Sequence, residues 1–164
     1  MPYDVTSTRL ETQALYDLKG PPEALLNWAG EALPAFPERP NTATGDGVVL
    51  MFIGPDHWLA RAELTAEESL ETALRPSEAP PEISIVKISD ALAFFRITGP
   101  DAGEVMAVAC PMDLHASRFG PEAVSFTEAF GLKALVTRCE GGFDLAVEQS
   151  FGPMVTDYLS RVIS

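Results

Sequence analysis

The chain has 164 residues, of which 46% are hydrophobic and 21% are charged, enough for one folded domain with its own core. Its 24 acidic and 11 basic residues give a formal net charge of -13, which disfavours binding to nucleic acid or to an anionic membrane surface. Two cysteines are too few for a disulfide framework, no signal sequence opens the chain, and no apolar stretch approaches the roughly 20 residues that span a bilayer. We therefore expect a cytoplasmic protein.

Residues 1–47 combine polar side chains with six prolines. A short helix is expected from Pro22 to Leu33, where Pro34 ends it. Because prolines separate the apolar residues of this segment, we expect a proline-rich N-terminal arm that wraps the core or a partner, with free disorder as the alternative. The predicted folded domain then covers residues 48–164.

Apolar runs separated by turn residues predict an antiparallel sheet in the middle of the chain. Two strand pairs are expected, at residues 48–53 with 58–62 and at residues 83–88 with 91–97. Between the pairs, Thr65 and Glu68 have the spacing of a capping box, which predicts a helix that runs to about Leu74.

Gly99 and Pro100 form a turn after the apolar run 91–97, and a short helix should begin there and end at Pro111. Residues 124–130 and 132–139 are expected to form one long strand or two short strands. Gly141 and Gly142 then predict a hairpin turn into a strand at residues 143–147. Ser150 should cap a closing amphipathic helix, whose apolar residues recur at intervals of three and four.

Two similar tetrapeptides, residues 53–56 (IGPD) and 98–101 (TGPD), each follow an apolar strand. This similarity suggests a duplicated strand-rich unit with a helix in each copy. The predicted fold class is therefore α+β, with antiparallel sheets and helices on one side, and two ferredoxin-like halves fit this pattern.

Residues 110–115 (CPMDLH) place a thiol, a carboxylate and an imidazole close together after the expected helix. Cys110 lacks the surrounding signature of a catalytic cysteine, so a buried structural thiol is the favoured interpretation. Zinc binding by Cys110, Asp113 and His115 together with His57 would need a spacing that fits no ligand pattern. Asp113 and His115 are instead expected to bond backbone groups in the exit turn.

Trp58 follows His57 at the start of an expected strand. An indole in this position could stack on a ligand ring, but packing in the core is the favoured interpretation. The glycines of the chain match neither a dinucleotide-binding fingerprint nor a P-loop, so the sequence offers no support for nucleotide binding.

The order of several short segments resembles the gamma subunit of heterotetrameric sarcosine oxidase, over about residues 48–163. That family is related in fold to the folate-binding domain of glycine-cleavage aminomethyltransferases. The segments are residues 53–59 (IGPDHWL), 88–90 (ISD), 98–102 (TGPDA), 110–115 (CPMDLH), 142–145 (GFDL) and 149–151 (QSF).

The resemblance implies a non-catalytic accessory subunit of a flavin-dependent complex that oxidatively demethylates sarcosine. It implies no catalytic, cofactor-binding or metal-binding residue in this chain, and it places FAD, FMN, NAD and tetrahydrofolate on the larger partner subunits. The expected partners are the larger alpha and beta subunits and the small delta subunit. The residues expected to form structural motifs or interfaces are Trp58, Gly99, Pro100, Cys110, Pro111, Asp113 and His115.

The alternative is a free-standing, tetrahydrofolate-binding protein similar to the aminomethyltransferases. Related stand-alone folate-binding proteins carry a Lys-Gly-Cys-Tyr type of signature, and this sequence contains none. A tetrahydrofolate enzyme is therefore the less favoured of the two hypotheses.

Overall fold

The computed structural model describes residues 2–164 and divides into two compact units. The central unit is Thr12–Asp90, and the terminal unit combines residues 2–11 with Ala91–Ser164. In the described residues each unit contains a five-stranded antiparallel sheet and two α-helices, which confirms the predicted α+β class.

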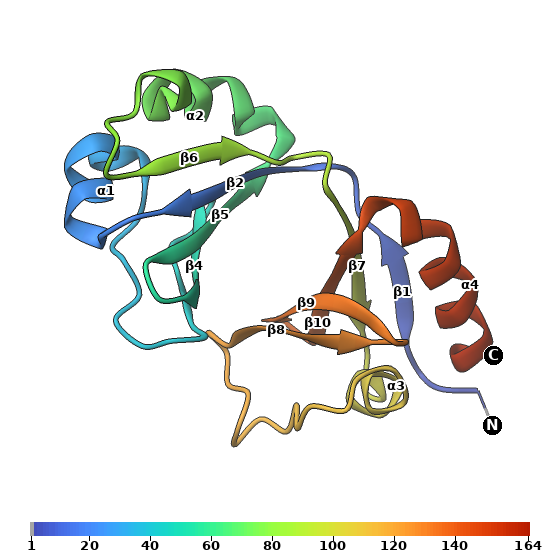
Figure 1. The fold of residues 1–164 in the computed structure, drawn as a ribbon. Coiled ribbons are helices and arrows are strands. Elements are labelled where there is room, and N and C mark those ends of the chain that lie inside the picture. The colour runs from blue at the N-terminus through green and yellow to red at the C-terminus, as the bar shows by residue number, and fades with distance from the viewer. Residues whose placement is uncertain (1) are drawn as a thin grey trace. The chain divides into compact units, whose positions relative to one another are not determined.

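The central unit has the ferredoxin-like order of elements, strand-helix-strand-strand-helix-strand. These elements are β2 (Gln13–Lys19), α1 (Pro22–Ala29), β4 (Val49–Gly54), β5 (His57–Glu63), α2 (Glu67–Leu74) and β6 (Ser84–Lys87), and the short strand β3 (Ala43–Thr44) is added at one edge. The sheet order is β3-β4-β5-β2-β6. Leu25 of α1 and Leu70 of α2 share one core with Tyr16 and Trp58, so both helices cover the same face of the sheet (Figure 1).

The terminal unit repeats this plan with one change in connectivity. Its elements are β1 (Thr6–Arg9), β7 (Leu92–Thr98), α3 (Ala102–Ala109), β8 (Val124–Ala129), β9 (Leu132–Cys139), β10 (Gly142–Glu148) and α4 (Gly152–Ile163). The sheet order β1-β7-β10-β9-β8 matches β6-β2-β5-β4-β3 place by place. The position that β6 fills at the end of the central unit is thus filled by β1, from the start of the chain. The predicted ferredoxin-like halves are confirmed, and the second is circularly permuted.

The division of the chain at residue 47 expected from the sequence differs from the division in the structure. Residues 1–47 include the edge strand β1 and the helix α1, and they include β2, which pairs with both β5 and β6. The prolines that suggested an arm lie outside β2, and Pro22 occupies the first turn of α1, where a missing amide hydrogen costs nothing.

Three details of the sequence prediction are wrong, and the first of them depends on long-range pairing. The expected pair 83–88 and 91–97 does not form, since β6 pairs with β2, and β7 pairs with β1 and β10. The proposed capping box is also absent, since a 3₁₀ turn (Leu64–Ala66) precedes α2 and no side chain caps the helix. Likewise Ser150 lies in a 3₁₀ turn, where its hydroxyl donates to Glu148 instead of capping α4.

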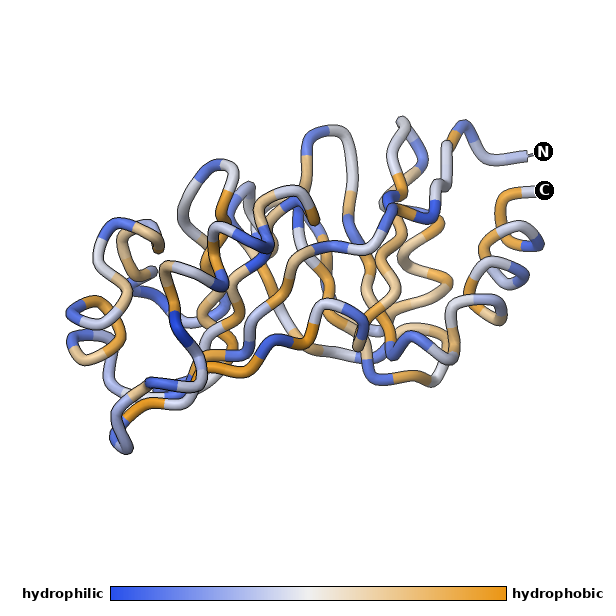
Figure 2. The backbone as a smooth tube through the Cα atoms, turned by 90° about the horizontal axis from the view of Figure 1, so that it is seen from above, coloured by the Kyte–Doolittle hydropathy of each residue, from blue (hydrophilic) through white to orange (hydrophobic). Residues whose placement is uncertain are grey.

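Helix α4 shows most clearly how hydropathy places an element against its sheet (Figure 2). Val155 and Leu159 are buried in the core of the terminal unit, while Asp157 and Ser160 are exposed. Burial of each large aliphatic side chain contributes about 1.5 to 3 kcal/mol. Among residues 2–164 no helix has the length and apolar character needed to cross a bilayer.

The internal repeat is found at the turn that joins β2 to α1 in the central unit and β7 to α3 in the terminal unit. Gly20-Pro21 follows β2, and Gly99-Pro100 follows β7. Gly20 and Gly99 adopt nearly the same left-handed backbone angle, with φ of 133° and 134°. The Gly20 amide donates to Asp56 in the β4–β5 turn at 2.9 Å, and the Gly99 amide donates to Gly141 in the β9–β10 turn at 3.1 Å.

The two tetrapeptides noticed in the sequence are therefore not equivalent positions. Residues 53–56 cover the end of β4 and the turn into β5, whereas residues 98–101 cover the end of β7 and the turn into α3. The duplication is real, but the equivalent of Gly99 is Gly20, whose turn lacks the aspartate that drew attention to the other two segments.

We expect Gly99→Ala to destabilise the protein by at least about 2 kcal/mol, because a Cβ there would lie 2.4 Å from the Asp4 carbonyl oxygen and φ is positive. Gly103→Ala is the matched control, since the space around its Cβ position is open and alanine favours the helix α3. Urea unfolding of both variants provides the measurement. Equal stability of the two would contradict the structural role of Gly99.

Candidate functional site

The segment that leaves α3, residues 110–119, contains the densest group of candidate residues. Cys110 is 3% exposed, its amide donates to Met106 at 2.8 Å, and its sulfur lies 3.9 Å from the hydroxyl oxygen of Thr127. His115, by contrast, is exposed and contacts Ser117. The thiol and the imidazole thus have different partners, and they do not form the nucleophile-base pair that a catalytic cysteine needs.

Asp113 and His115 organise a local turn in this segment. An Oδ1 atom of Asp113 accepts a hydrogen bond from the His115 amide at 3.0 Å, and the Ser117 amide donates to Nδ1 of His115 at 3.2 Å. Both side chains are exposed.

Because water can replace an exposed acceptor, we expect Asp113→Ala to lower the free energy of unfolding by only about 0.5 to 1 kcal/mol, less than the removal of a buried partner would.

Arg138 of β9 holds the same segment in place, and sequence reasoning missed it. Its Nη2 donates to the carbonyl oxygens of Leu114 at 2.6 Å and Phe119 at 2.7 Å, and its Nε donates to Phe119 at 3.1 Å. The guanidinium carbon also lies 4.3 Å from the centroid of the Phe143 ring. A planar cation with several donors is well suited to carbonyls converging from a loop. No sequence pattern signals this role, since its acceptors are backbone atoms.

Trp58 lies in the core of the central unit, where it is 3% exposed. Its ring centroid is 4.3 Å from that of Phe52 and 4.9 Å from that of Phe36, and its indole nitrogen donates to Gly20 at 3.4 Å. The parts of the indole ring that could have contacted a ligand ring are therefore in contact with neighbouring side chains. The geometry agrees with the packing role that the sequence favours.

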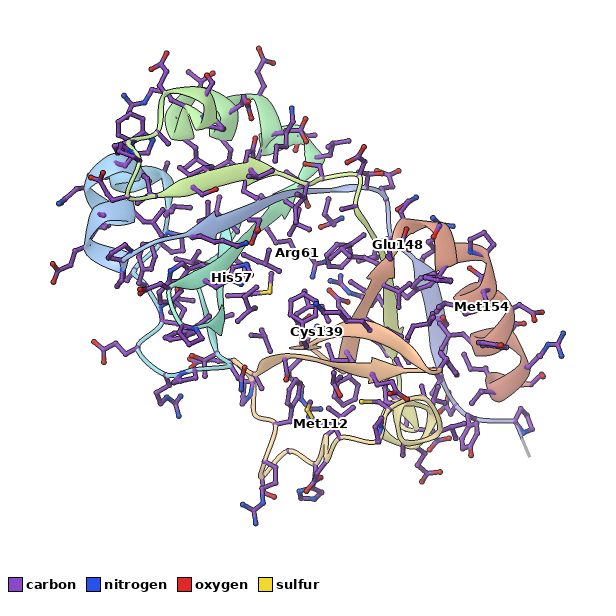
Figure 3. The ribbon with its side chains drawn as sticks, in the orientation of Figure 1. His57, Arg61, Met112, Cys139, Glu148 and Met154 are labelled. Atoms are coloured by element: carbon purple, nitrogen blue, oxygen red, sulfur yellow. The ribbon has the colours of Figure 1, made fainter. Side chains whose placement is uncertain are left out.

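His57 and Arg61 project from β5 (Figure 3), and His57 contacts the carboxylate of Asp17 on β2. Lys19 lies 3.9 Å from the same carboxylate. Within residues 2–164, no three His, Cys, Asp or Glu side chains are grouped as a metal would require. His57 belongs to the central unit, whereas Cys110, Asp113 and His115 belong to the terminal unit.

Arg96 and Asp144 form a bidentate ion pair between β7 and β10, with both N–O distances 2.8 Å. Asp144 is only 3% exposed, while the Arg96 side chain is 47% exposed. The hydrogen bonds from Asp144 raise the pKa of Arg96 above its ordinary value. The pair neutralises a buried carboxylate in the middle of the sheet, which is a structural role.

Tyr16 joins the sheet of the central unit to α2. Its ring is fully buried, and its hydroxyl donates to a carboxylate oxygen of Glu71 at 2.7 Å. Burial, followed by the hydrogen bond to Glu71, raises the pKa of Tyr16 above its ordinary value. Glu71 of α2 thus has a specific partner in the sheet.

Comparison with known proteins identifies a sequence relative. The gamma subunit of sarcosine oxidase from Corynebacterium sp. (strain P-1) is 28% identical over 93 residues, which span 57% of this chain and 45% of that subunit. The chain therefore matches less than half the length of this curated relative. No protein-family model matches the sequence.

Solved structures extend the similarity over nearly the whole chain. A chain of the heterotetrameric sarcosine oxidase from Corynebacterium sp. U-96, in complex with pyrrole 2-carboxylate, has a TM-score of 0.78 and 24% identity and covers 98% of this chain and 86% of that one. The resemblance predicted from the sequence is confirmed. The glycine cleavage system aminomethyltransferase T from Bartonella henselae has a TM-score of 0.72 and 13% identity, and the match covers 96% of this chain but 46% of that one. The aminomethyltransferase-like fold is confirmed as well.

We expect Arg138→Met to destabilise the protein by about 2 to 3 kcal/mol, because three carbonyl hydrogen bonds are lost from a charged donor. Arg118→Met removes the same charge from an exposed side chain in the supported segment and should change stability by less than about 0.5 kcal/mol. Urea unfolding measures both, and hydrogen exchange should speed up in residues 110–119 only for Arg138→Met. A loss no larger than that of Arg118→Met would show that Arg138 is dispensable.

The raised pKa of Tyr16 predicts that the stability of the protein depends on pH. Its pKa is raised in the folded state, so its contribution is complete below the unfolded pKa of about 10 and is lost as the pH rises above that value. Tyr16→Phe should therefore lose less stability than the parent protein between about pH 8 and pH 11. Thermal melts at the two pH values test this, with Tyr158→Phe, at an exposed ring, as the control. Identical pH profiles for Tyr16→Phe and the parent protein would refute the assignment.

Proposed function

We propose that this chain is a non-catalytic accessory subunit of a flavin-dependent heterotetrameric sarcosine oxidase, in the position of the gamma subunit. The observation that carries the proposal is the fold similarity to a chain of such an oxidase, which includes 98% of this chain and 86% of that one. The aminomethyltransferase has twice the extent of this chain, since the matched region is 46% of it. The size and fold of this chain therefore agree better with the oxidase chain.

The candidate residues support this interpretation through their contacts. Trp58 packs between aromatic rings, Cys110 is buried beside Thr127, and Asp113 bonds the backbone of its own turn. Gly99 and Pro100 form the turn that begins α3. We assign these residues to folding and to the shape of the surface, and we assign no step of catalysis to them.

In this proposal the larger alpha and beta subunits carry the chemistry. FAD, FMN, NAD and tetrahydrofolate are bound there, and the small delta subunit completes the assembly. Sarcosine is the substrate of the complex, which removes its methyl group by oxidation to leave glycine. This chain would contribute surface to the assembly.

Co-expression with the genes for large flavoprotein subunits from the same genome tests the proposal. We expect the tagged chain to retain a yellow complex that demethylates sarcosine, because a subunit of the oxidase must bind the subunits that hold the flavin. The isolated chain should be colourless and inactive. Glycine formation and the flavin absorbance band are the measurements.

Two results would overturn the proposal. One is failure of the tagged chain to retain any flavoprotein when all subunits are soluble. The other is stoichiometric binding of tetrahydrofolate by the isolated chain in calorimetry, which would favour the free-standing aminomethyltransferase-like alternative.

A further inference from the structure

A groove of about 360 Å³ lies between the edge strand β1 and helix α4 of the terminal unit. The two elements lie side by side in Figure 1. Val5, Phe95, Leu159 and Ile163 give the groove an apolar floor, and Ser7 and Arg9 line it from the strand. We call it the β1–α4 groove.

The free edge of β1 offers unpaired backbone groups along this groove. The amide of Leu10 donates to the Phe94 carbonyl at 2.8 Å, so the alternation of an antiparallel ladder directs Thr8 and Thr6 toward β7 as well. The N–H and C=O groups of Ser7 and Arg9 then point away from β7. Because β1 is the last strand of its sheet, these groups can bond to an added strand.

Arg9 supplies a positive charge at one end of the groove. Its guanidinium carbon lies 5.9 Å from the centroid of Phe95, and its Nη2 lies 3.1 Å from the Gln149 amide oxygen when that oxygen faces it. Among residues 2–164 no carboxylate forms an ion pair with Arg9. In a chain with a net charge of -13 this cation is exposed, so its guanidinium is accessible to an acidic group that enters the groove.

The start of α4 leaves room for the Arg9 guanidinium. The Cα of Gly152 faces the guanidinium so closely that a Cβ there would lie 2.7 Å from Nη2 of Arg9. On the helix side, Thr156 and Ser160 donate their hydroxyls to carbonyls of their own helix. That wall of the groove is therefore polar but uncharged, and Arg9 is the group that can select a ligand by charge.

We infer that the β1–α4 groove binds an extended segment of a partner subunit, which adds to β1 as a sixth strand of the sheet. The segment carries an acidic side chain that pairs with Arg9 and an apolar side chain that fills the floor at Phe95 and Leu159. The backbone groups of Ser7 and Arg9 supply affinity, and the guanidinium supplies selectivity. This inference rests on the proposed function, because the partner is one of the flavoprotein subunits.

Two substitutions test the groove in the full chain, with the co-expressed flavoprotein subunits as the probe. Ser7→Pro removes an outward N–H and leaves the ladder to β7 intact, since proline is tolerated at an edge when its position faces outward. Arg9→Glu reverses the charge. Each should weaken binding to the flavoprotein at least about tenfold, while the melting temperature stays close to that of the parent chain.

The controls separate lost binding from lost folding. Arg118→Glu makes the same charge change at an exposed residue outside the groove and should bind normally. Thr8→Pro removes an amide that faces β7 and should lower the melting temperature. If Ser7→Pro also proves unstable, Arg9→Glu and hydrogen exchange of the parent complex test the groove instead. The Ser7 and Arg9 amides should become protected from exchange on assembly. The Thr8 amide should be protected both before and after assembly.

The outcomes distinguish this inference from the proposed function. If the parent chain binds the flavoprotein and both groove variants bind equally well, the groove assignment is overturned and the proposed function stands. If the parent chain does not bind at all, both are overturned. A dimer of the isolated chain that Ser7→Pro dissociates would assign the groove to a second copy of this chain and would also overturn the inference.

Discussion

The close backbone approach at Gly20 and Gly99 is the constraint on which the arrangement of each unit depends. Each glycine follows the strand that leads into a helix, β2 or β7, and its amide bonds to a hairpin turn, β4–β5 or β9–β10. The Cα of each glycine also lies close to the segment just before the edge strand. At Gly20 a Cβ would lie 2.9 Å from the Glu82 carbonyl oxygen, just before β6. At Gly99 it would meet Asp4 and Val5, just before β1. Only a residue without a side chain lets three segments converge there.

This convergence explains how one plan can be built from two different connectivities. In each unit the edge strand must pass close to the glycine. The turn at the glycine does not require that the edge strand come from the end of the unit. In the terminal unit the chain's own beginning supplies it, and Asp4 bonds to Asp101 across 97 residues of sequence. The terminal unit therefore cannot form its sheet edge from residues 91–164 alone. A segment that looks like an arm is part of the folded structure.

The charged and polar side chains of the conspicuous exit segment act mostly on the backbone beside them. Asp113 and His115 shape the turn locally, and Arg138 holds it from a neighbouring strand. Elsewhere, Asp144 is neutralised by Arg96, and the Tyr16 hydroxyl has Glu71 as its acceptor. These polar groups are satisfied by the protein itself, which suits a subunit whose proposed contribution is a surface. Arg9 is different, because its charge faces a groove and has no counterion among the described residues.

The sequence by itself determined the type and approximate position of most elements, because helices, hairpins and turns depend on neighbours a few residues apart. The amphipathic pattern after Ser150, the turn at Gly141 and the stop at Pro111 are local signals, and each marks a boundary near its expected place. The order and spacing of short segments also sufficed to indicate the family resemblance. Trp58 could be placed in the core because an indole after a turn usually packs there.

Only the tertiary structure decided which strands pair, where the units divide and which residue supports the exit segment. The free energy of pairing β1 with β7 comes from contacts between residues about 90 positions apart, and no local pattern records them. The role of Arg138 was equally hidden, since it bonds to carbonyl oxygens that every residue possesses. Gly20 and Gly99 share nearly the same backbone angle and a following proline, but their other neighbours differ. The internal repeat is therefore clear in conformation and hydrogen bonding and is only a Gly-Pro pair in the sequence.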